Sequence, residues 1–554
     1  MSEENRSIIS SSRMFPEDFT PQKAFDRMQS GSTEYTITNN GADTRLASFF
    51  GRANYTLKDR YLFTATVRAD GSTKFAPGNQ WGIFPSAAFA WRISSEPFLK
   101  NVSQIDDMKI RLSYGEAGNN RIDNDMWRRT YVGAITSPVA GVGNVPNLYY
   151  ENTSSTLINP SLKWETTITR NFGIDYSFFN NRLSGTIDFY WNTTKDLLLK
   201  SVVPASSGYN DQLRNIGQTS NRGFEFSITG QLVRKRNFSL TATLNFSLNR
   251  NKVDKLAGVD ETFYRSGWAE GLRESDDFIL RVGQPTGLIY GYVTDGFYQV
   301  DDYQQGSDGK WYLKEGIANS QSITQAYNTI NQGAGVPSPG SLKLKKTTPV
   351  DPDNPDTYNI TPDDRQIIGN TNPKHTGGLN LSAVYKNLDI SLFFNWVYGN
   401  DVYNANKIQF TTQWKKDYYN MLSVISSANR FRYMDDAGNK ITDMEQLRTL
   451  NENATIWSPA MKIPVLHSWA TEDGSFLRLN NITIGYTLPT KWTKRVLINR
   501  CRVYCTVNNV FVWTKYSGFD PEVSTCLSTP LTPGVGFSSY PKARTFTLGA
   551  NITF

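Results

Sequence analysis

This chain of 554 residues contains only three cysteines and two histidines. Cys501 and Cys505 fall four positions apart on one predicted strand, about 13 Å from each other, which is too far for a disulfide. Cys526 falls in a predicted loop. So few cysteines in so long a chain argue against a disulfide scaffold. His375 and His467 are too far apart in sequence to suggest a metal pair.

Long hydrophobic runs are also missing. No stretch of 18 apolar residues occurs, which excludes a transmembrane helix but not a membrane β-barrel, whose strands expose apolar side chains only at alternate positions. The first six residues show no apolar signal region. The net charge is +7, yet no basic stripe with interleaved aromatics is present, so we expect solvated charges and no nucleic-acid partner.

The chain does contain many aromatic residues, 13% of the total, and segments in which apolar and polar residues strictly alternate. In residues 544–554 the even positions after 544 are apolar and the odd positions are Thr, Gly or Asn. Residues 388–398 and 164–178 repeat this pattern with few breaks. The alternating segments are longer than the ~5–6 residues of globular strands, and a strand needs about 9–11 residues to cross a bilayer. The pattern predicts an all-β transmembrane antiparallel barrel, with a soluble sandwich or propeller as the alternative.

We expect about 13 strands: 46–57, 60–70, 82–93, 107–117, 162–179, 182–199, 217–233, 238–253, 374–386, 388–403, 475–488, 500–514 and 544–554. Tight turns alternate with long loops, and in outer-membrane barrels the long loops lie outside the cell. Residues 1–45 are therefore expected to form an extracellular segment with a short helix at 20–31, and 46–554 the barrel portion.

Eight stretches resemble the barrel of SusC-like TonB-dependent transporters, the SusC/RagA family of Bacteroidetes outer membranes. They are RADGSTKF at 68–75, GIFPSAAFAWRIS at 82–94, KIRLSYGEAGN at 109–119, NPSLKWETT at 159–167, SLNRNKV at 247–253, FLRLNNITIGYTLP at 476–489, NNVFVWTKYSGFDPEVS at 508–524 and YPKARTFTLGANITF at 540–554. They follow the family order across nearly the whole chain. The terminal Phe554 resembles the signal that the barrel-assembly machinery reads.

The resemblance starts about midway through a full-length member. Such transporters close about 22 strands around a plug, so it implies that an N-terminal plug and barrel half are absent and that TonB is reached only through them. It also implies an outer-membrane location in a Gram-negative bacterium, a SusD-like lipoprotein partner, and import of an oligosaccharide or a peptide.

No acid/base or nucleophile constellation is visible, so we expect no enzyme. In relatives an EF-hand-like calcium loop often occupies the region of Asp351, Asp353 and Asp364, but here Tyr358 replaces the turn glycine. A Ca²⁺ site there and an ordinary loop both stay open. The long loops carry aromatics that either stack on a substrate or pack the loops. These are Trp127, Tyr149, Tyr150, Tyr209, Trp268, Tyr298 and Trp311.

Three rival functions accompany this reading. A siderophore or cobalamin receptor of the TonB-dependent type would lack a SusD-like neighbour. A soluble glycan-binding β protein would not need detergent. A non-functional gene remnant would transport nothing.

Overall fold

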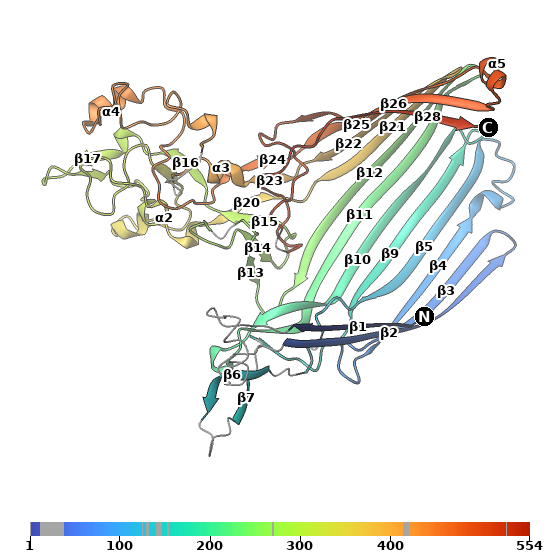
Figure 1. The fold of residues 1–554 in the computed structure, drawn as a ribbon, viewed down its shortest axis with the longest axis horizontal. Helices are drawn as coiled ribbons and strands as arrows, with labels where there is room; N and C mark the ends of the chain where they lie inside the picture. The colour runs from blue at the N-terminus through green and yellow to red at the C-terminus, as the bar shows by residue number, and fades with distance from the viewer. Residues whose placement is uncertain are drawn as a thin grey trace, which may run out of the picture.

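The computed structural model describes residues 2–11, 38–124, 126–128, 132–139, 147–151, 155–268, 271–413, 420–527 and 529–554. Its main feature is one large antiparallel sheet, which Figure 1 shows curving like part of a barrel wall. In order of hydrogen bonding its strands are β1 (Ser2–Ser11), β2 (Thr38–Leu57), β3 (Tyr61–Ser72), β4 (Trp81–Arg92), β5 (Ile105–Asn119), β9 (Glu165–Phe178), β10 (Leu183–Val202), β11 (Asp211–Lys235), β12 (Phe238–Lys255), β21 (His375–Tyr385), β22 (Leu388–Tyr398), β25 (Phe476–Thr487), β26 (Arg500–Thr514) and β28 (Thr545–Thr553).

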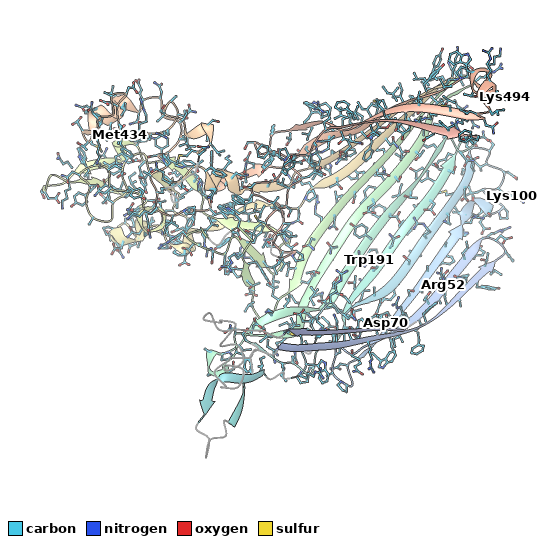
Figure 2. The ribbon with its side chains drawn as sticks, in the orientation of Figure 1. Arg52, Asp70, Lys100, Trp191, Met434 and Lys494 are labelled. Carbon is cyan, nitrogen blue, oxygen red and sulfur yellow. The ribbon has the colours of Figure 1, made fainter. Side chains whose placement is uncertain are left out.

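The 13 predicted strands are confirmed as β2 to β28 of this path. Short connections join them at one rim, where Asn180 and Asn181 turn the chain with positive φ. In Figure 2, Lys100 and Lys494 mark this rim and Met434 lies in the loops at the opposite end of the strands. The sequence therefore placed both rims correctly.

Several strand boundaries differ from expectation: β2 begins at Thr38 rather than 46, and β11 begins at Asp211 rather than 217. Residues 2–11, expected within the extracellular segment, form β1, which pairs with residues 38–47, the N-terminal half of β2. The connecting segment 12–37, with the helix expected at 20–31, lies outside the described residues. The strand expected over 388–403 ends at Tyr398, because Gly399 adopts a φ of +77°. The chain then forms β23 (Asp401–Asn404), which pairs with other strands.

Register and alternation give the sheet one continuous apolar face. One row runs directly across seven strands as Tyr55, Phe63, Phe89, Leu112, Phe172, Phe189 and Phe224. Another crosses the C-terminal strands as Ile390, Ile484, Cys505 and Leu548. Phe63 and Phe189, both in the first row, are each 45% exposed. A broad exposed apolar face of this kind is what a barrel presents to lipid.

The long connections fold into a layer at one end of β12, β21 and β22 (Figure 1). Its strands and helices are β13 (Glu261–Tyr264), β14 (Phe278–Arg281), β15 (Leu288–Gly291), β16 (Thr294–Phe297), β17 (Tyr303–Gln305), β18 (Trp311–Leu313), α2 (Gln321–Thr324), β19 (Leu342–Leu344), β20 (Gln366–Asn370), β23, α3 (Ala405–Gln409), α4 (Met444–Leu450), β24 (Thr471–Asp473) and β27 (Val535–Gly536). Outside it are β6 (Val132–Val139), β7 (Asn147–Glu151), β8 (Thr156–Leu157) and α5 (Thr490–Thr493). We call the part built from 256–373, 399–474 and 515–543 the loop layer.

The loop layer has its own hydrophobic cores. One unites Phe278 and Ile289 with Tyr403 and Val535, so it draws on all three connections. A second joins Tyr292 and its neighbours to Trp457. The long loops are thus one packed unit rather than separate arms. Within the described residues, no helix has the length and apolarity needed to pass through a membrane.

Candidate functional site

The face opposite the apolar rows is polar and internally ion-paired. On it Arg111 reaches Asp175 at 2.7 Å and Asp188 at 3.1 Å, and Lys109 reaches Asp175 at 2.8 Å. Gly173 stands between Arg111 and Asp188, and a Cβ there would lie 2.6 Å from atoms of both. The missing side chain therefore lets an ion pair bridge β5 and β10 across β9.

The same arrangement recurs near the C-terminus. Arg502 donates from Nε to Asp389 Oδ1 at 2.9 Å across Gly485, and a Cβ on that glycine would lie 2.3 Å from the guanidinium. Threonine pairs such as Thr229 and Thr243, whose hydroxyl oxygens are 3.0 Å apart, fill the face between these ion pairs. A wall of paired charges and hydroxyls suits a water-filled path for a hydrated substrate.

Where β12, β21 and β22 meet the loop layer, a cavity of about 640 Å³ opens. It is lined by Asn249, Arg250, Asn251, Pro285, Asn370, Asn372, Pro373, Lys374, Tyr398, Gly399, Asp401, Asp473 and Ser475. Asp401 accepts a bond from the Asn370 backbone N–H at 2.7 Å. Burial and the nearby Asp473 carboxylate raise the pKa of Asp401 above its usual range. The lining combines amide donors and acceptors with two basic and two acidic side chains, so it fits a polar, hydrogen-bonding ligand.

A buried cluster fixes the 515–543 connection to the sheet. Arg478, 2% exposed, donates to Asp520 at 2.7 Å and pairs with Glu522 at 3.1 Å. Lys542 reaches Glu522 at 2.8 Å, and Asn509 accepts from Arg478 at 2.7 Å. These residues come from the FLRLNN, NNVFVW, FDPE and YPKAR stretches. The sequence showed those motifs but assigned none of them a role, because their meeting depends on the tertiary fold.

The structure distributes the predicted loop aromatics rather than gathering them. Trp268 packs edge-on against Tyr403, with ring centroids 5.8 Å apart, inside a loop-layer core. Tyr298 is 0% exposed and donates its hydroxyl to Ala318 O at 2.6 Å. Trp311, on β18, packs against the core that contains Tyr298. These three rings pack the loop layer, the second of the two roles considered for them.

The remaining predicted residues lie apart from that layer. The indole N–H of Trp127 is buried and has no hydrogen-bond partner in the described part of the chain. Tyr209 is half-buried in the connection between β10 and β11. Tyr149 and Tyr150 belong to β7, but their side chains lie outside the described residues. Phe554 follows β28 and is 82% exposed. Substrate stacking and the assembly signal stay predictions.

The three predicted metal ligands do not form one cluster. Asp364 is buried and accepts bonds from Lys346 Nζ and Thr361 N, each at 2.8 Å. Asp351 and Asp353 are exposed, and Asp351 accepts from the Asp353 backbone N–H at 3.0 Å. Among the described residues no group of three or more His, Cys, Asp or Glu side chains is placed to hold a metal ion. A Ca²⁺ site stays a prediction that this geometry does not support.

Comparison with known proteins gives consistent results. The family model "TonB dependent receptor-like, beta-barrel" matches residues 10–510. TonB-dependent receptor P3 of Formosa agariphila is 30% identical over all of this chain and 49% of its own length. TonB-dependent receptor SusC of Bacteroides thetaiotaomicron is 29% identical over 97% of this chain and 46% of its own length. The chain thus spans about half the length of these curated relatives.

Among solved structures, the RagAB peptide transporter aligns with a TM-score of 0.68 and 23% identity, covering 95% of this chain and 49% of that chain. The open-open state of the RagAB peptide importer aligns with a TM-score of 0.66 over 100% of this chain and 51% of that chain. At this identity the likeness establishes a shared fold.

Proposed function

Because the chain belongs to the TonB-dependent receptor-like β-barrel family of the Gram-negative outer membrane, we propose that it forms the wall, lumen face and outer loops of a nutrient importer. The cargo is an oligosaccharide, with a peptide as the alternative. This family is non-enzymatic. TonB acts on the importer through a plug that another part of the protein supplies.

The division between the two sheet faces carries this proposal. One face is apolar and exposed, the other holds paired charges and hydroxyls, and a polar cavity opens where the strands meet the loop layer. A soluble β protein would bury its apolar face, whereas here that face matches lipid. The cavity offers amides together with acidic and basic groups that can hydrogen-bond a hydrated polar cargo, which supports a glycan or a peptide.

Uptake by the complete importer tests the cargo. Asn249→Ala removes a cavity amide. We expect uptake of the transported oligosaccharide at low concentration to fall about tenfold, which corresponds to the loss of one or two hydrogen bonds between neutral groups. Asn245→Ala is the matched control, since Asn245 is on the same strand and face but outside the cavity. Equal uptake by both variants contradicts a role for the cavity, and loss of peptide uptake alone would make the peptide the cargo.

The partner we propose is a SusD-like lipoprotein that covers the loop layer. The RagAB peptide transporter, with which this chain shares its fold, has a name that points to two components. The β17–β18 hairpin is a suitable contact because its tip, residues 306–310, is only lightly buried while Tyr303 anchors its base. Replacing 306–310 by two glycines should weaken co-purification of the lipoprotein. The same replacement at the opposite rim, in residues 236–237, should not, and equal effects would place the partner elsewhere.

A further inference from the structure

A row of cationic and amphipathic aromatic side chains crosses the apolar face at one level. Direct register pairs join Tyr114 to Arg170, Arg170 to Trp191, Trp191 to Arg222 and Arg222 to Arg250. Because side chains alternate, this row lies on the same side of the sheet as Phe172, Phe189 and Phe224. Along each strand it is two residues closer to the long loops. Three arginines therefore stand on the surface that faces lipid, where charges are costly.

These arginines have no acidic partners in the described part of the chain. Arg222 and Arg250 are exposed and directly opposite each other, an arrangement in which like charges repel. Arg170 donates only to Thr193 at 3.4 Å, and Arg250 donates to the carbonyls of Asn249 and Lys374 at 2.9 Å. On the polar face, by contrast, arginines are paired with aspartates. An anion from outside the chain would satisfy the row.

The nearby acids on this face are already engaged. Glu116 accepts from the Tyr114 hydroxyl at 2.5 Å, and Asp254 accepts from Ser220 at 3.1 Å and from Gln218 at 3.3 Å. Lys252, two positions beyond Arg250 and exposed, adds a further positive charge with no ion pair among the described residues. The face therefore carries net positive charge at this level.

The level corresponds to the outer leaflet. Arg170 lies five positions into β9 from the long-loop end, while the tight turn follows only after Phe178. The apolar rows fill the space between. Trp and Tyr side chains gather where a membrane meets water, and Trp191 and Tyr114 flank the arginines there.

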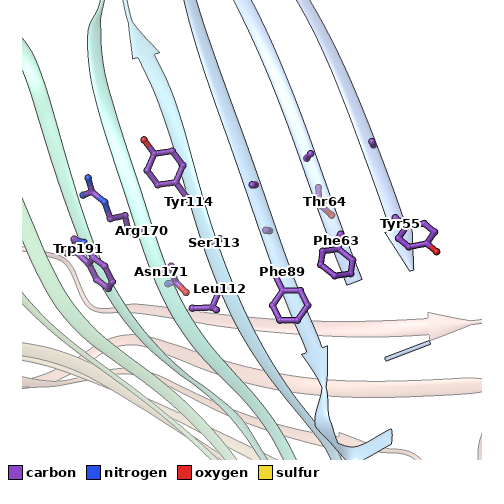
Figure 3. A pocket seen from close by; sticks show the side chains of 14 residues that line it. Tyr55, Phe63, Thr64, Phe89, Leu112, Ser113, Tyr114, Arg170, Asn171 and Trp191 are labelled. Carbon is purple, nitrogen blue, oxygen red and sulfur yellow. The ribbon is translucent and has the colours of Figure 1, made fainter. Parts of the chain in front are cut away.

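An apolar groove of about 700 Å³ adjoins the row. Figure 3 shows Phe63, Phe89 and Leu112 along it, with Tyr114, Arg170 and Trp191 at one end. A ligand with an apolar tail and an anionic head would fill both parts at once. Free phosphate would use only the arginines.

We propose that this row and groove bind a phosphate-bearing lipid of the outer leaflet. The phosphate contacts Arg170, Arg222 and Arg250, whose guanidinium groups favour phosphate geometry, and an acyl chain lies in the groove. The inference rests on the outer-membrane location and not on any cargo. Arg250 also lines the cavity, so the R170Q/R222Q variant, which leaves the cavity lining unchanged, separates lipid binding from uptake.

Lipid retained by the purified complete importer tests the site. The protein is exchanged into nanodiscs of phosphatidylcholine with a tenth of bis-phosphorylated lipid A, and bound glycolipid is counted by native mass spectrometry. We expect the R170Q/R222Q/R250Q variant to retain at least fivefold less lipid A than the unchanged protein. R52Q is the matched control, because Arg52 is an exposed arginine whose register pairing places it on the polar face.

Further arms separate the alternatives. Dephosphorylated lipid A should be retained no better than by the triple variant, and millimolar inorganic phosphate should not displace bound lipid A. Full displacement would make the row a free-anion site and overturn the lipid assignment, as would equal retention by the triple variant. Should the triple variant fail to fold, judged by heat-modifiable migration, R222Q alone decides, because the Arg222 side chain makes no hydrogen bond or ion pair within the described residues. This variant should lose about half of the bound lipid, and unchanged retention would overturn the proposal.

Discussion

A single buried carboxylate, Asp364, organises one loop of the loop layer. Asp364 accepts bonds from Thr347 N at 3.0 Å and Thr348 N at 2.9 Å in addition to Lys346 and Thr361. Burial alone would raise the pKa of Asp364, but Lys346 and the backbone N–H groups outweigh it and hold that pKa well below its usual range. The carboxylate therefore stays ionised and ties residues 346–348 to 361–364.

Asp364→Ala should loosen this loop strongly. The change leaves Lys346, whose side chain is 12% exposed, without its ionic partner, and breaking such a pair costs about 3–5 kcal/mol. We expect faster hydrogen exchange at 344–365 while the sheet is unchanged. Asp363→Ala, at the exposed neighbour, is the control. Exchange at the same rate in both variants would contradict this role.

His467 is the second residue whose protonation bears on the loop layer. It is buried beside Trp457, and its Nδ1 lies 2.6 Å from Thr294 Oγ1. Burial, aided by the charge of Lys407, lowers the pKa of His467 to about 3. An unfolded histidine titrates near pH 6.5, so below that pH the unfolded state binds a proton that the folded state rejects.

Acid should therefore destabilise the loop layer through His467. Its free energy of unfolding is expected to fall by up to about 1.4 kcal/mol per pH unit as the pH drops from roughly 6 towards 4. His467→Gln, which does not titrate, should flatten that part of the curve when thermal unfolding of the complete importer is followed against pH. Identical slopes for the two proteins would show that other groups set the acid response.

Among the elements, the long strands define where lipid lies. β28 alternates Phe546, Leu548 and Ile552 with threonines, and Leu548 continues the row through Cys505 and Ile484. Each strand that a row crosses contributes one member to it, so the position of a residue along its strand sets its depth in the bilayer.

Leu548→Arg tests this assignment. A charge facing lipid near the bilayer centre costs about 2–4 kcal/mol, so the folded fraction of the complete barrel in urea should decrease. Thr547→Arg places the same charge on the polar face and should cost clearly less. Similar losses at both positions would mean that the two faces have been interchanged.

The whole sheet has two open sides. β1 pairs only with β2 and β28 only with β26 among the described strands. Each outer strand therefore presents a row of unpaired backbone N–H and C=O groups, which neither lipid nor a barrel interior satisfies.

This chain by itself should not fold to a stable monomeric barrel. Refolded alone in detergent it should aggregate or associate, whereas refolding with a chain that supplies the remaining strands should give one heat-modifiable species on a gel. Light scattering and gel migration follow both outcomes. A heat-resistant monomer of the isolated chain would refute the requirement for further strands.

Sequence reasoning succeeded where side chains alternate and failed where contacts are distant. It located β21 and β25 to within a residue or two, because a period of two directly reports which face is buried. It continued β22 past Tyr398, since one glycine with positive φ leaves no periodic signal. It left two roles open for Trp268 and Tyr298, substrate stacking and loop packing, because an aromatic in a long loop looks the same in sequence whether it packs or binds.

The sequence by itself determined the all-β class, the 13 strands from β2 to β28 of the main sheet, the two rims and the apolar face, since each follows from local alternation and turn residues. Only the tertiary structure decided how the loops pack into one layer, that Arg478 joins four separate motifs, and that Arg170, Arg222 and Arg250 share one level. Those features depend on strand register and on contacts between residues far apart in sequence. A one-residue shift in register would move every such side chain to the other face.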